Sequence, residues 1–439
     1  MISLRVCRLA MIRVFLVLLV PPLVAQQATK GSPPEKLSIE RAVEIAFANH
    51  PDLRAARERE AAAQAGIGIS RSQYFPQASF NGIGKLGLSG ATNGLGLIGL
   101  PASPFYRNLS DAVSINQNIF DFGRTRHATA ERRAGAKATT FDLHVIRIQV
   151  GMRAKESFLK VLSIRRAIQV REQSLRERQA VERKAREFYE VGLSSKLELN
   201  LARVGLSNAE LALTEARNDE RVAWAELFAA LAQPEGEHYE LVEPEFHLQE
   251  PSDLNTEIEQ ALASRPDLKS MEAQIDAQRE RVEVARSLRR PALRGVFSGG
   301  FARFAGYSAS RLLVGGLGLF APIYNGGELR LQVEQEEHNL QALEALHAAR
   351  VLQIRAELSL AHADLLKALE SMRAYRQTAE YAEEALRLAQ TRYRAQLTSF
   401  VELLATETAA EEARAKDAQA IYSFLAARFR LDAATGIGP

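Results

Sequence analysis

The chain has almost no cysteine. Its single cysteine, Cys7, lies within the first 25 residues, which carry Arg5, Arg8 and Arg13 ahead of an apolar run from 14 to 20. A basic start, a short apolar stretch and a small residue at the end are typical of a secretory signal peptide, and this run is too short to cross a membrane as a helix. We therefore expect residues 1–25 to be removed on export, which leaves no disulfide, thiol nucleophile or cysteine for lipid attachment.

The remaining chain also lacks an excess of charge and a long apolar run. Without the three arginines of the expected signal peptide, it has 53 basic and 53 acidic residues. A chain without net positive charge is a poor nucleic-acid binder, so we expect no nucleic-acid partner. No stretch of about 18 apolar residues follows the signal peptide, so no transmembrane helix is expected.

Signatures of catalysis are missing as well. The eight histidines are scattered, and neither a nucleophile with its base nor a pair of carboxylates stands out from the general helix charge. Two segments, 82–87 and 94–99, fit the pattern G-x-G-x-x-G, but neither opens a helix, and glycine on curved strands explains them better. We expect no enzyme activity, no cofactor and no metal.

Proline is absent between Pro104 and Pro234, and the sequence there is helical in pattern. A helix from about 127 to 189 would be roughly 95 Å long at 1.5 Å per residue, far longer than a globular domain needs. The segment 188–199 interrupts this pattern, with Gly192 as the expected turn. A second helix then returns over 196–231.

The restart of the helix carries a capping signal that occurs twice. Ser195 and Glu198 have the spacing of a capping box, in which each side chain satisfies a free backbone N–H at a helix start. Ser399 and Glu402 repeat this spacing 204 residues later. The sequence therefore predicts two helical hairpins with the same kind of tip.

The hairpin tips belong to a repeat that covers the whole chain. Pro51 in Ala-Asn-His-Pro-Asp-Leu matches Pro266 in Ala-Ser-Arg-Pro-Asp-Leu at an offset of 215, which Pro76 and Pro291 share. From Phe120, which matches Tyr324, the offset is 204. The first copy is thus 11 residues longer between Pro76 and Phe120, which predicts a loop there.

Alternating sequence patterns predict two strands in each copy, within 77–122 and 292–324. In the first copy Val113, Ile115 and Ile119 alternate with polar residues, as in strands with one apolar and one wet face. Strands of about ten residues in an exported chain without membrane helices resemble those of outer-membrane barrels. Four strands do not close a barrel, so several chains must contribute to one; twelve strands from three chains leave room for a lumen, and periodicity alone leaves dimers open.

A heptad pattern marks the last part of the chain. Two sets of positions at seam spacing run over six heptads and predict a coiled coil with close helix approach. One set holds His347, Ile354, Ala361, Ala368, Tyr375, Ala382 and Ala389, and the other holds Val351, Leu358, Leu365, Met372, Ala379, Leu386 and Tyr393.

These observations predict a duplicated, mainly α chain with long coiled-coil helices and four β-strands. The expected boundaries are a signal peptide (1–25), a first repeat (26–232, with helices 38–75, strands 77–122 and long helices 127–231), a linker or equatorial segment (233–256) and a second repeat (257–439, with helices 257–290, strands 292–324 and long helices 328–434).

The chain resembles the outer-membrane efflux proteins of the TolC type over almost all of its mature length. The resemblance rests on the opening from Leu37 to Leu53, the segment Asn-Ile-Phe-Asp-Phe-Gly123, the tip Val191-Gly-Leu-Ser194 and the duplication. It implies a homotrimer with a twelve-stranded transmembrane β-barrel in the outer membrane of a Gram-negative-type bacterium and a long periplasmic barrel of helices. It also implies a periplasmic adaptor protein, an inner-membrane transporter acting through that adaptor, and contact with outer-membrane lipid.

The resemblance assigns contact and constriction sites and no chemistry. The family's turns meet the adaptor, which assigns that role to Val191, Gly192, Leu193 and Ser194, and to Gln396, Leu397 and Thr398. Gln396 departs from the pattern because it stands where the first tip has Gly192. The alternative interpretation is that these segments are only tight turns, because helix capping alone would explain Ser195 and Glu198.

The family closes its periplasmic entrance with polar residues near the tips. This similarity makes Tyr375, Glu383, Glu384 and Arg387 the entrance candidates, although the seam position of Tyr375 also suits a core residue.

The alternative function is a periplasmic coiled-coil scaffold without channel activity. It accounts for the heptads and the capping signals, but it leaves the alternating Gly-rich strands unexplained.

Overall fold

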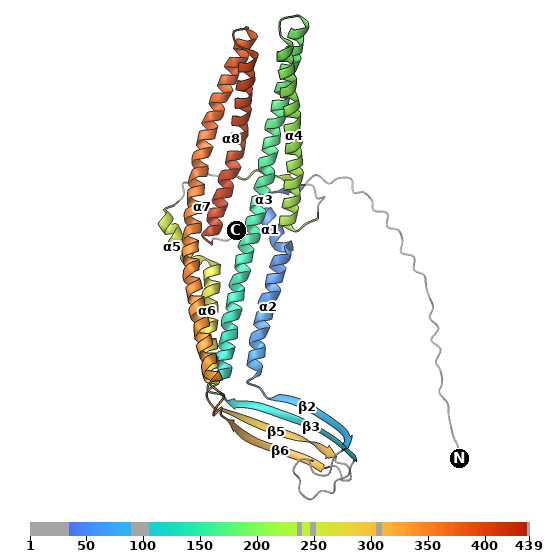
Figure 1. The fold of residues 1–439 in the computed structure, drawn as a ribbon, viewed down its shortest axis with the longest axis vertical. Coiled ribbons are helices and arrows are strands. Elements are labelled where there is room, and N and C mark those ends of the chain that lie inside the picture. Colours follow the sequence, from blue (N-terminus) through green and yellow to red (C-terminus); the bar gives the residue numbers. More distant parts are fainter. Residues whose placement is uncertain (1–34, 89–104, 235–238, 246–251, 304–309, 437–439) are drawn as a thin grey trace, which may run out of the picture.

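The computed structural model describes residues 35–88, 105–234, 239–245, 252–303 and 310–436. The expected signal peptide, the 94–99 glycine pattern and most of the loop predicted between the two strands of 77–122 lie outside the described residues. Long helices form a rod that stands on a β-sheet, and short helices lie beside the middle of the rod (Figure 1).

The two halves of the chain contain the same series of elements. The first half has β1 (Glu35–Leu37), α1 (Ile39–Asn49), α2 (Pro51–Ser72), β2 (Gln77–Leu88), β3 (Phe105–Phe120), α3 (Arg124–Glu190) and α4 (Lys196–Leu231). The second half has β4 (Tyr239–Leu241), α5 (Leu254–Ser264), α6 (Pro266–Ser287), β5 (Ala292–Arg303), β6 (Ser310–Phe320), α7 (Glu328–Arg394) and α8 (Phe400–Ala434).

Equal element lengths support the duplication. The helices α1 and α5 have 11 residues each, α2 and α6 have 22, and α3 and α7 have 67. The starts of α2 and α6 differ by 215 positions and those of α3 and α7 by 204. The length difference therefore falls in the strand region between them.

Local capping fixes where the helices begin. Ser38 caps α1 by accepting a hydrogen bond from the Arg41 N–H at 3.2 Å, and α2 and α6 each open with a proline, whose missing N–H is harmless in the first turn. Asp121 accepts from the N–H of Thr125 at 3.0 Å at the start of α3. Each 67-residue helix then runs for about 100 Å. None of the described helices is apolar enough over a sufficient length to cross a membrane.

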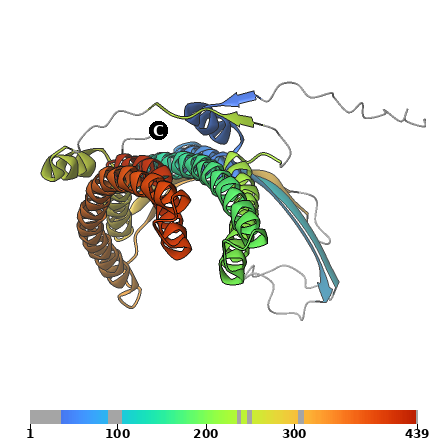
Figure 2. The same ribbon diagram turned by 90° about the horizontal axis from the view of Figure 1, so that it is seen from above.

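The long helices lie side by side in one curved layer (Figure 2). Away from the sheet the neighbours run α7, α8, α3, α4, and nearer the sheet they run α7, α6, α3, α2. Two apolar cores hold the middle of the layer together, one around Phe158 and Leu227 and the other around Leu358, Leu365 and Leu431. In both orders α7 is one edge, and the other edge belongs to the first half of the chain.

The predicted coiled-coil seam of α7 is confirmed with one exception. Its positions are buried or half-buried against neighbouring helices, and Ile354, Leu358 and Leu365 are fully buried. Tyr375 is the exception because it is exposed, while Met372 three residues earlier is buried. The interpretation of Tyr375 as a core residue is therefore wrong for the single chain.

All four predicted strands lie in one antiparallel sheet with the order β2-β3-β5-β6. The central contact joins the two halves of the chain, with Val113 opposite Gly299 and Ile115 opposite Phe297. Within one chain β2 and β6 each have a neighbour on one side only, so the sheet is open. The glycine pattern at 82–87 lies inside β2.

The register places apolar side chains on one face of the sheet. Leu313, Leu317 and Leu319 on β6 are each more than 70% exposed, and their face continues through Phe297 to Phe80. The glycines make room on this face, since a Cβ at Gly315 would lie 3.3 Å from the Phe297 ring. The opposite face carries the Ser114 and Ser298 hydroxyls, 3.3 Å apart, with Asn116 beside them.

Candidate functional site

The two helical hairpins end in tips of the same geometry at the end of the rod opposite the sheet (Figure 1). In the first tip the Leu193 N–H donates to the Phe188 carbonyl at 2.8 Å, and in the second the Leu397 N–H donates to the Arg392 carbonyl at 2.9 Å. This six-to-one bond is the Schellman ending, which needs a left-handed residue just before it. Gly192 supplies that residue with φ 77°, and Gln396 supplies it with φ 57°.

The capping box is present only in part. The hydroxyls of Ser195 and Ser399 cap the returning helices as predicted, accepting from the N–H groups of Glu198 and Glu402. The two glutamates do not reach back to the capping residues. Glu198 instead accepts from the Ser194 hydroxyl at 2.6 Å, and Glu402 accepts from the Thr398 hydroxyl. Ser194 and Thr398, the residues just before the caps, thus bind the carboxylates that would complete a capping box. These hydrogen bonds hold both residues in the turns.

Both tips expose apolar side chains. Val191, Leu193 and Leu397 are each more than 60% exposed, although a residue in a tight turn needs no apolar side chain. Gln396 is exposed as well. The structure therefore brings Val191, Gly192, Leu193 and Ser194 together at one tip, and Gln396, Leu397 and Thr398 at the other.

The four entrance candidates do not form one cluster in a single chain. Glu384 and Arg387 make an exposed pair at 2.6 Å on α7. Glu383 points instead to α8, where it accepts from Arg414 at 2.8 Å. Tyr375 lies about 12 Å along the helix from Glu383, eight residues away.

An ionic seam that the sequence analysis missed joins the two hairpins. Its members are Arg171, Glu177, Arg178, Glu383, Glu407, Glu411 and Arg414, from α3, α7 and α8. Arg414 bridges α3 and α7, because it also donates to Glu177 at 2.9 Å. Arg171 pairs with Glu411 beside it. These ionic contacts add to two small apolar clusters near the tips, one around Leu403 and the other around Phe400.

Glu407 is the most buried carboxylate of the ionic seam, at 4% exposure. Its Oε2 accepts from Arg178 at 2.8 Å, while its Oε1 has no partner among the described residues. Burial raises the pKa of Glu407 to about 7 against the opposing effect of Arg178, and Glu177 and Glu411 add to the rise. A glutamate at the seam spacing of Phe400, Leu403 and Ala410 is the sequence signal that could have found it.

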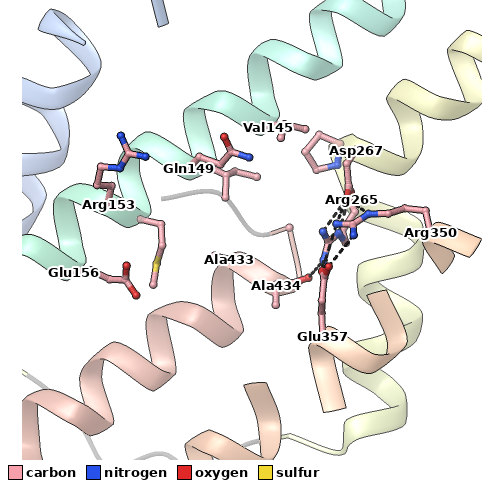
Figure 3. Close-up of a pocket in the computed structure, with 14 residues that line it drawn as sticks. Val145, Gln149, Arg153, Glu156, Arg265, Asp267, Arg350, Glu357, Ala433 and Ala434 are labelled. Atoms are coloured by element: carbon pink, nitrogen blue, oxygen red, sulfur yellow. Dashed lines mark hydrogen bonds and ion pairs between the residues drawn. The ribbon is translucent and has the colours of Figure 1, made fainter. Parts of the chain in front are cut away.

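A cavity of about 430 Å³ lies in the middle of the rod, where α3, the α5–α6 corner, α7 and the end of α8 meet (Figure 3). Arg265 donates to Asp267, to Glu357 and to the Ala434 carbonyl, and Arg350 donates to the same two carboxylates. Every charge of this group has an internal partner, so its contacts fasten the end of α8 to the α5–α6 corner. Among the described residues, no cluster of histidine, cysteine and acidic side chains could hold a metal ion.

The different left-handed residues of the two tips, Gly192 and Gln396, give a first prediction. Gln396→Gly removes the cost of holding a side chain in the left-handed region, about 1 kcal/mol, so the Leu397 amide should exchange its hydrogen several-fold more slowly. Gly192→Gln is the reciprocal change, and it should speed exchange at Leu193, since nothing lies within 4 Å of the added Cβ and only the backbone is strained. Hydrogen–deuterium exchange of the purified protein tests both, and faster exchange at Leu397 in Gln396→Gly would contradict the account.

Glu407 gives a second prediction. Its folded pKa of about 7 lies above the ordinary 4.5, so its contribution to stability is complete below pH 4.5 and is lost as the pH rises through 7. Glu407→Gln keeps the neutral form and an acceptor for Arg178. As the pH rises from 5 to 8, we expect the free energy of unfolding of this variant to increase by about 2 kcal/mol relative to that of the unchanged protein.

Thermal unfolding at a series of pH values measures this gain. Glu384→Gln is the matched control, because Glu384 is exposed and Arg387 lowers its pKa, which leaves no titration between pH 5 and pH 8. Parallel pH profiles for Glu407→Gln and the unchanged protein would show that Glu407 does not titrate in this range.

Comparisons with known proteins identify the family of the chain. The family model described as outer membrane efflux protein matches residues 42–233 and 258–437. The pyoverdine export outer membrane protein OpmQ of Pseudomonas putida is 28% identical, over 91% of this chain and 86% of its own length. The outer membrane protein TolC of Salmonella enteritidis is 23% identical, over 74% of this chain and 69% of its own length.

Solved structures share the fold. The outer-membrane channel OprN superposes with a TM-score of 0.80 at 19% identity, covering 91% of this chain and 90% of its own. The Campylobacter jejuni CmeC outer membrane channel gives 0.79 at 18% identity, covering 91% and 85%. The fold and the matched family agree with an efflux protein of the outer membrane whose long helices lie in the periplasm, and the chain belongs to the outer membrane efflux protein family.

Proposed function

We propose that three copies of this chain form one continuous exit conduit, which receives its substrate from a periplasmic adaptor and an inner-membrane transporter. The observation that carries this proposal is the pair of free edges that every layer of the chain has. The sheet ends on β2 and β6, and the helical layer ends on α7 at one edge and on α4 or α2 at the other. Different edges that meet head to tail generate a ring when the rotation closes.

The open sheet supports closure most strongly. A lipid-exposed sheet edge would leave backbone N–H and C=O groups without partners, so β6 of one chain should pair with β2 of the next. Three chains then supply twelve strands. The apolar face with Phe80, Phe297 and Leu317 would meet lipid, and the polar face with Ser114 and Asn116 would line the lumen.

The helical edges carry apolar side chains that a single chain leaves uncovered. On α4, Leu197, Val204 and Leu211 repeat every seven residues, and each is more than half exposed. On α7, Tyr381 and Leu388 have the same spacing and are also exposed. Heptad spacing is that of helices that pack along their length, so α4 of one chain should pack on α7 of the next.

Within each copy we propose the division of the chain given by its sequence. Residues 26–232 and 257–439 act as the two repeats, each with its short helices, strands and long hairpin, and 233–256 is the equatorial connector. The parallel pair β1–β4 supports an equatorial place for the connector, because it ties residues 239–241 to the start of the first repeat.

We further propose that the tips contact the adaptor through Val191, Gly192, Leu193, Ser194, Gln396, Leu397 and Thr398. The exposure of Leu193 and Leu397 supports this role, since an apolar residue at a rod tip gains free energy when a partner covers it. The relative from Pseudomonas putida exports pyoverdine by its name, which makes a similar small molecule one candidate substrate.

The adaptor role gives a third prediction. Leu193→Asp and Leu397→Asp each place a charge where an apolar contact is expected, so each should lower adaptor affinity at least about tenfold while the trimer remains intact. Binding of the purified adaptor hairpin, with mass measured in parallel, provides the test. Leu193→Met is the control that keeps an apolar side chain and should bind as before. Unchanged affinity in both aspartate variants would remove the tips from the contact.

The entrance candidates give a fourth prediction. If Tyr375 and Arg387 narrow the entrance, with Glu383 and Glu384 as nearby acids, Tyr375→Ala/Arg387→Ala should raise single-channel conductance in planar bilayers severalfold. Tyr375→Phe/Arg387→Lys keeps bulk and charge and should stay near the original value. Equal conductance in all three proteins would place the constriction elsewhere.

A further inference from the structure

The corner that joins helix to strand is built twice with the same backbone. After α2 the Phe75 N–H donates to the Ser72 carbonyl at 3.0 Å, and after α6 the Arg290 N–H donates to the Ser287 carbonyl at 3.0 Å. The serine hydroxyls also make matching hydrogen bonds. Ser72 donates to the Ile69 carbonyl at 2.7 Å, and Ser287 donates to the Val284 carbonyl at 2.6 Å. A proline follows in both corners, and the strand starts at the next residue. The fold therefore places no demand on the side chains just before that proline.

Those side chains nevertheless differ in kind between the copies. The first corner has Tyr74 and Phe75, which are 49% and 66% exposed. The second corner has Arg289 and Arg290, which are also exposed and make no ion pair with any described residue. Arg286, one turn earlier, is different because Glu283 and Glu337 neutralise it. The second corner thus presents two free positive charges at the position where the first presents two aromatic rings.

The surroundings of both corners are those of a membrane interface. Exposed aromatic and apolar side chains gather at the helix–sheet junction, where they include Phe120, Phe122, Phe320, Ile323 and Tyr324. Aromatic residues concentrate at the level of the lipid headgroups, at the border of the hydrocarbon. The exposed apolar face of the sheet begins immediately beyond them.

Strand length agrees with this placement. Strand β5 has 12 residues, and at about 3.3 Å per residue and a tilt of about 40° it rises roughly 30 Å, the thickness of the hydrocarbon core. With β5 spanning the hydrocarbon, Arg289 and Arg290 lie just outside it. They are then level with the phosphates of the leaflet on the helix side.

We propose that Arg289 and Arg290 bind the phosphate of an anionic phospholipid in the periplasmic leaflet, while Tyr74 and Phe75 pack among neutral headgroups at the matching corner. This proposal rests on the proposed membrane placement of the sheet. Guanidinium groups match phosphate oxygens in a two-pronged geometry, and the two adjacent arginines have no internal acid to compete for them. The apolar strand face next to the corner provides a surface for the acyl chains, which favours a lipid over free phosphate. In a ring of three chains, lipid-binding and aromatic corners would alternate.

The test compares the lipids that copurify with the full-length protein from vesicles of phosphatidylethanolamine and phosphatidylglycerol in equal amounts. Arg289→Tyr/Arg290→Phe makes the second corner like the first, and Tyr74→Arg/Phe75→Arg makes the first like the second. Arg132→Gln/Arg133→Gln is the matched control, since it removes two adjacent, exposed charges about 13 Å up α3, beyond the headgroups. Bound lipid is counted by native mass spectrometry.

We expect phosphatidylglycerol to be enriched on the unchanged protein and on the control. The enrichment should fall at least about fivefold in Arg289→Tyr/Arg290→Phe and rise in Tyr74→Arg/Phe75→Arg, as the interaction of an arginine with an anionic surface implies. Full enrichment in Arg289→Tyr/Arg290→Phe would overturn the lipid site while leaving the conduit intact. Failure of the unchanged protein to enter vesicles of any composition would instead overturn the membrane placement of the sheet, and the lipid site with it.

Discussion

The unpaired edges of the four-stranded sheet are the constraint on which the rest of this structure depends. Strands β2 and β6 each leave a row of backbone groups without partners, and these groups must be paired wherever water is absent. The helical layer also has two different edges, with α7 on one side and the first half of the chain on the other. A single head-to-tail contact can therefore satisfy the sheet and the rod together. The 67-residue helices α3 and α7 each follow a strand of the sheet, so pairing of the strands also aligns these helices.

Duplication explains both the regularity of the chain and its departures from symmetry. The two copies agree to within one residue in the lengths of their helices, and they agree in the backbone of their corners and tips. They differ at exposed positions, at Phe75 and Arg290 in the corners and at Gly192 and Gln396 in the tips. The backbone leaves the corner side chains free, whereas Gln396 holds the left-handed conformation at a cost of about 1 kcal/mol. These differences give the two copies different surfaces for partners. Near the tips the ionic seam around Glu407 adds charged contacts to the apolar packing, which makes the junction between the hairpins sensitive to charge.

Much of the fold could be predicted from the sequence because its signals are periodic and local. The heptads from 347 onward, the capping serines Ser195 and Ser399 and the alternation around Val113 each depend on a few neighbouring residues, and the structure confirms all three. Features that depend on other helices were missed. Tyr375 lies at a seam position yet is exposed, and Glu407 gains its raised pKa from burial against α3, which no local pattern reveals. The assignment of Tyr375, Arg387 and the tip residues to function stays a prediction, because it concerns surfaces that only other chains can cover.

The most direct measurement is the mass of the mature protein extracted from outer membranes in mild detergent, by light scattering corrected for bound detergent. The shared edges predict a particle of three chains, in which disulfides formed between cysteines introduced on β6 and β2 link different copies. A monomer that stays in solution without detergent would contradict the closed conduit, and it would leave the coiled-coil scaffold as the better account of the long helices.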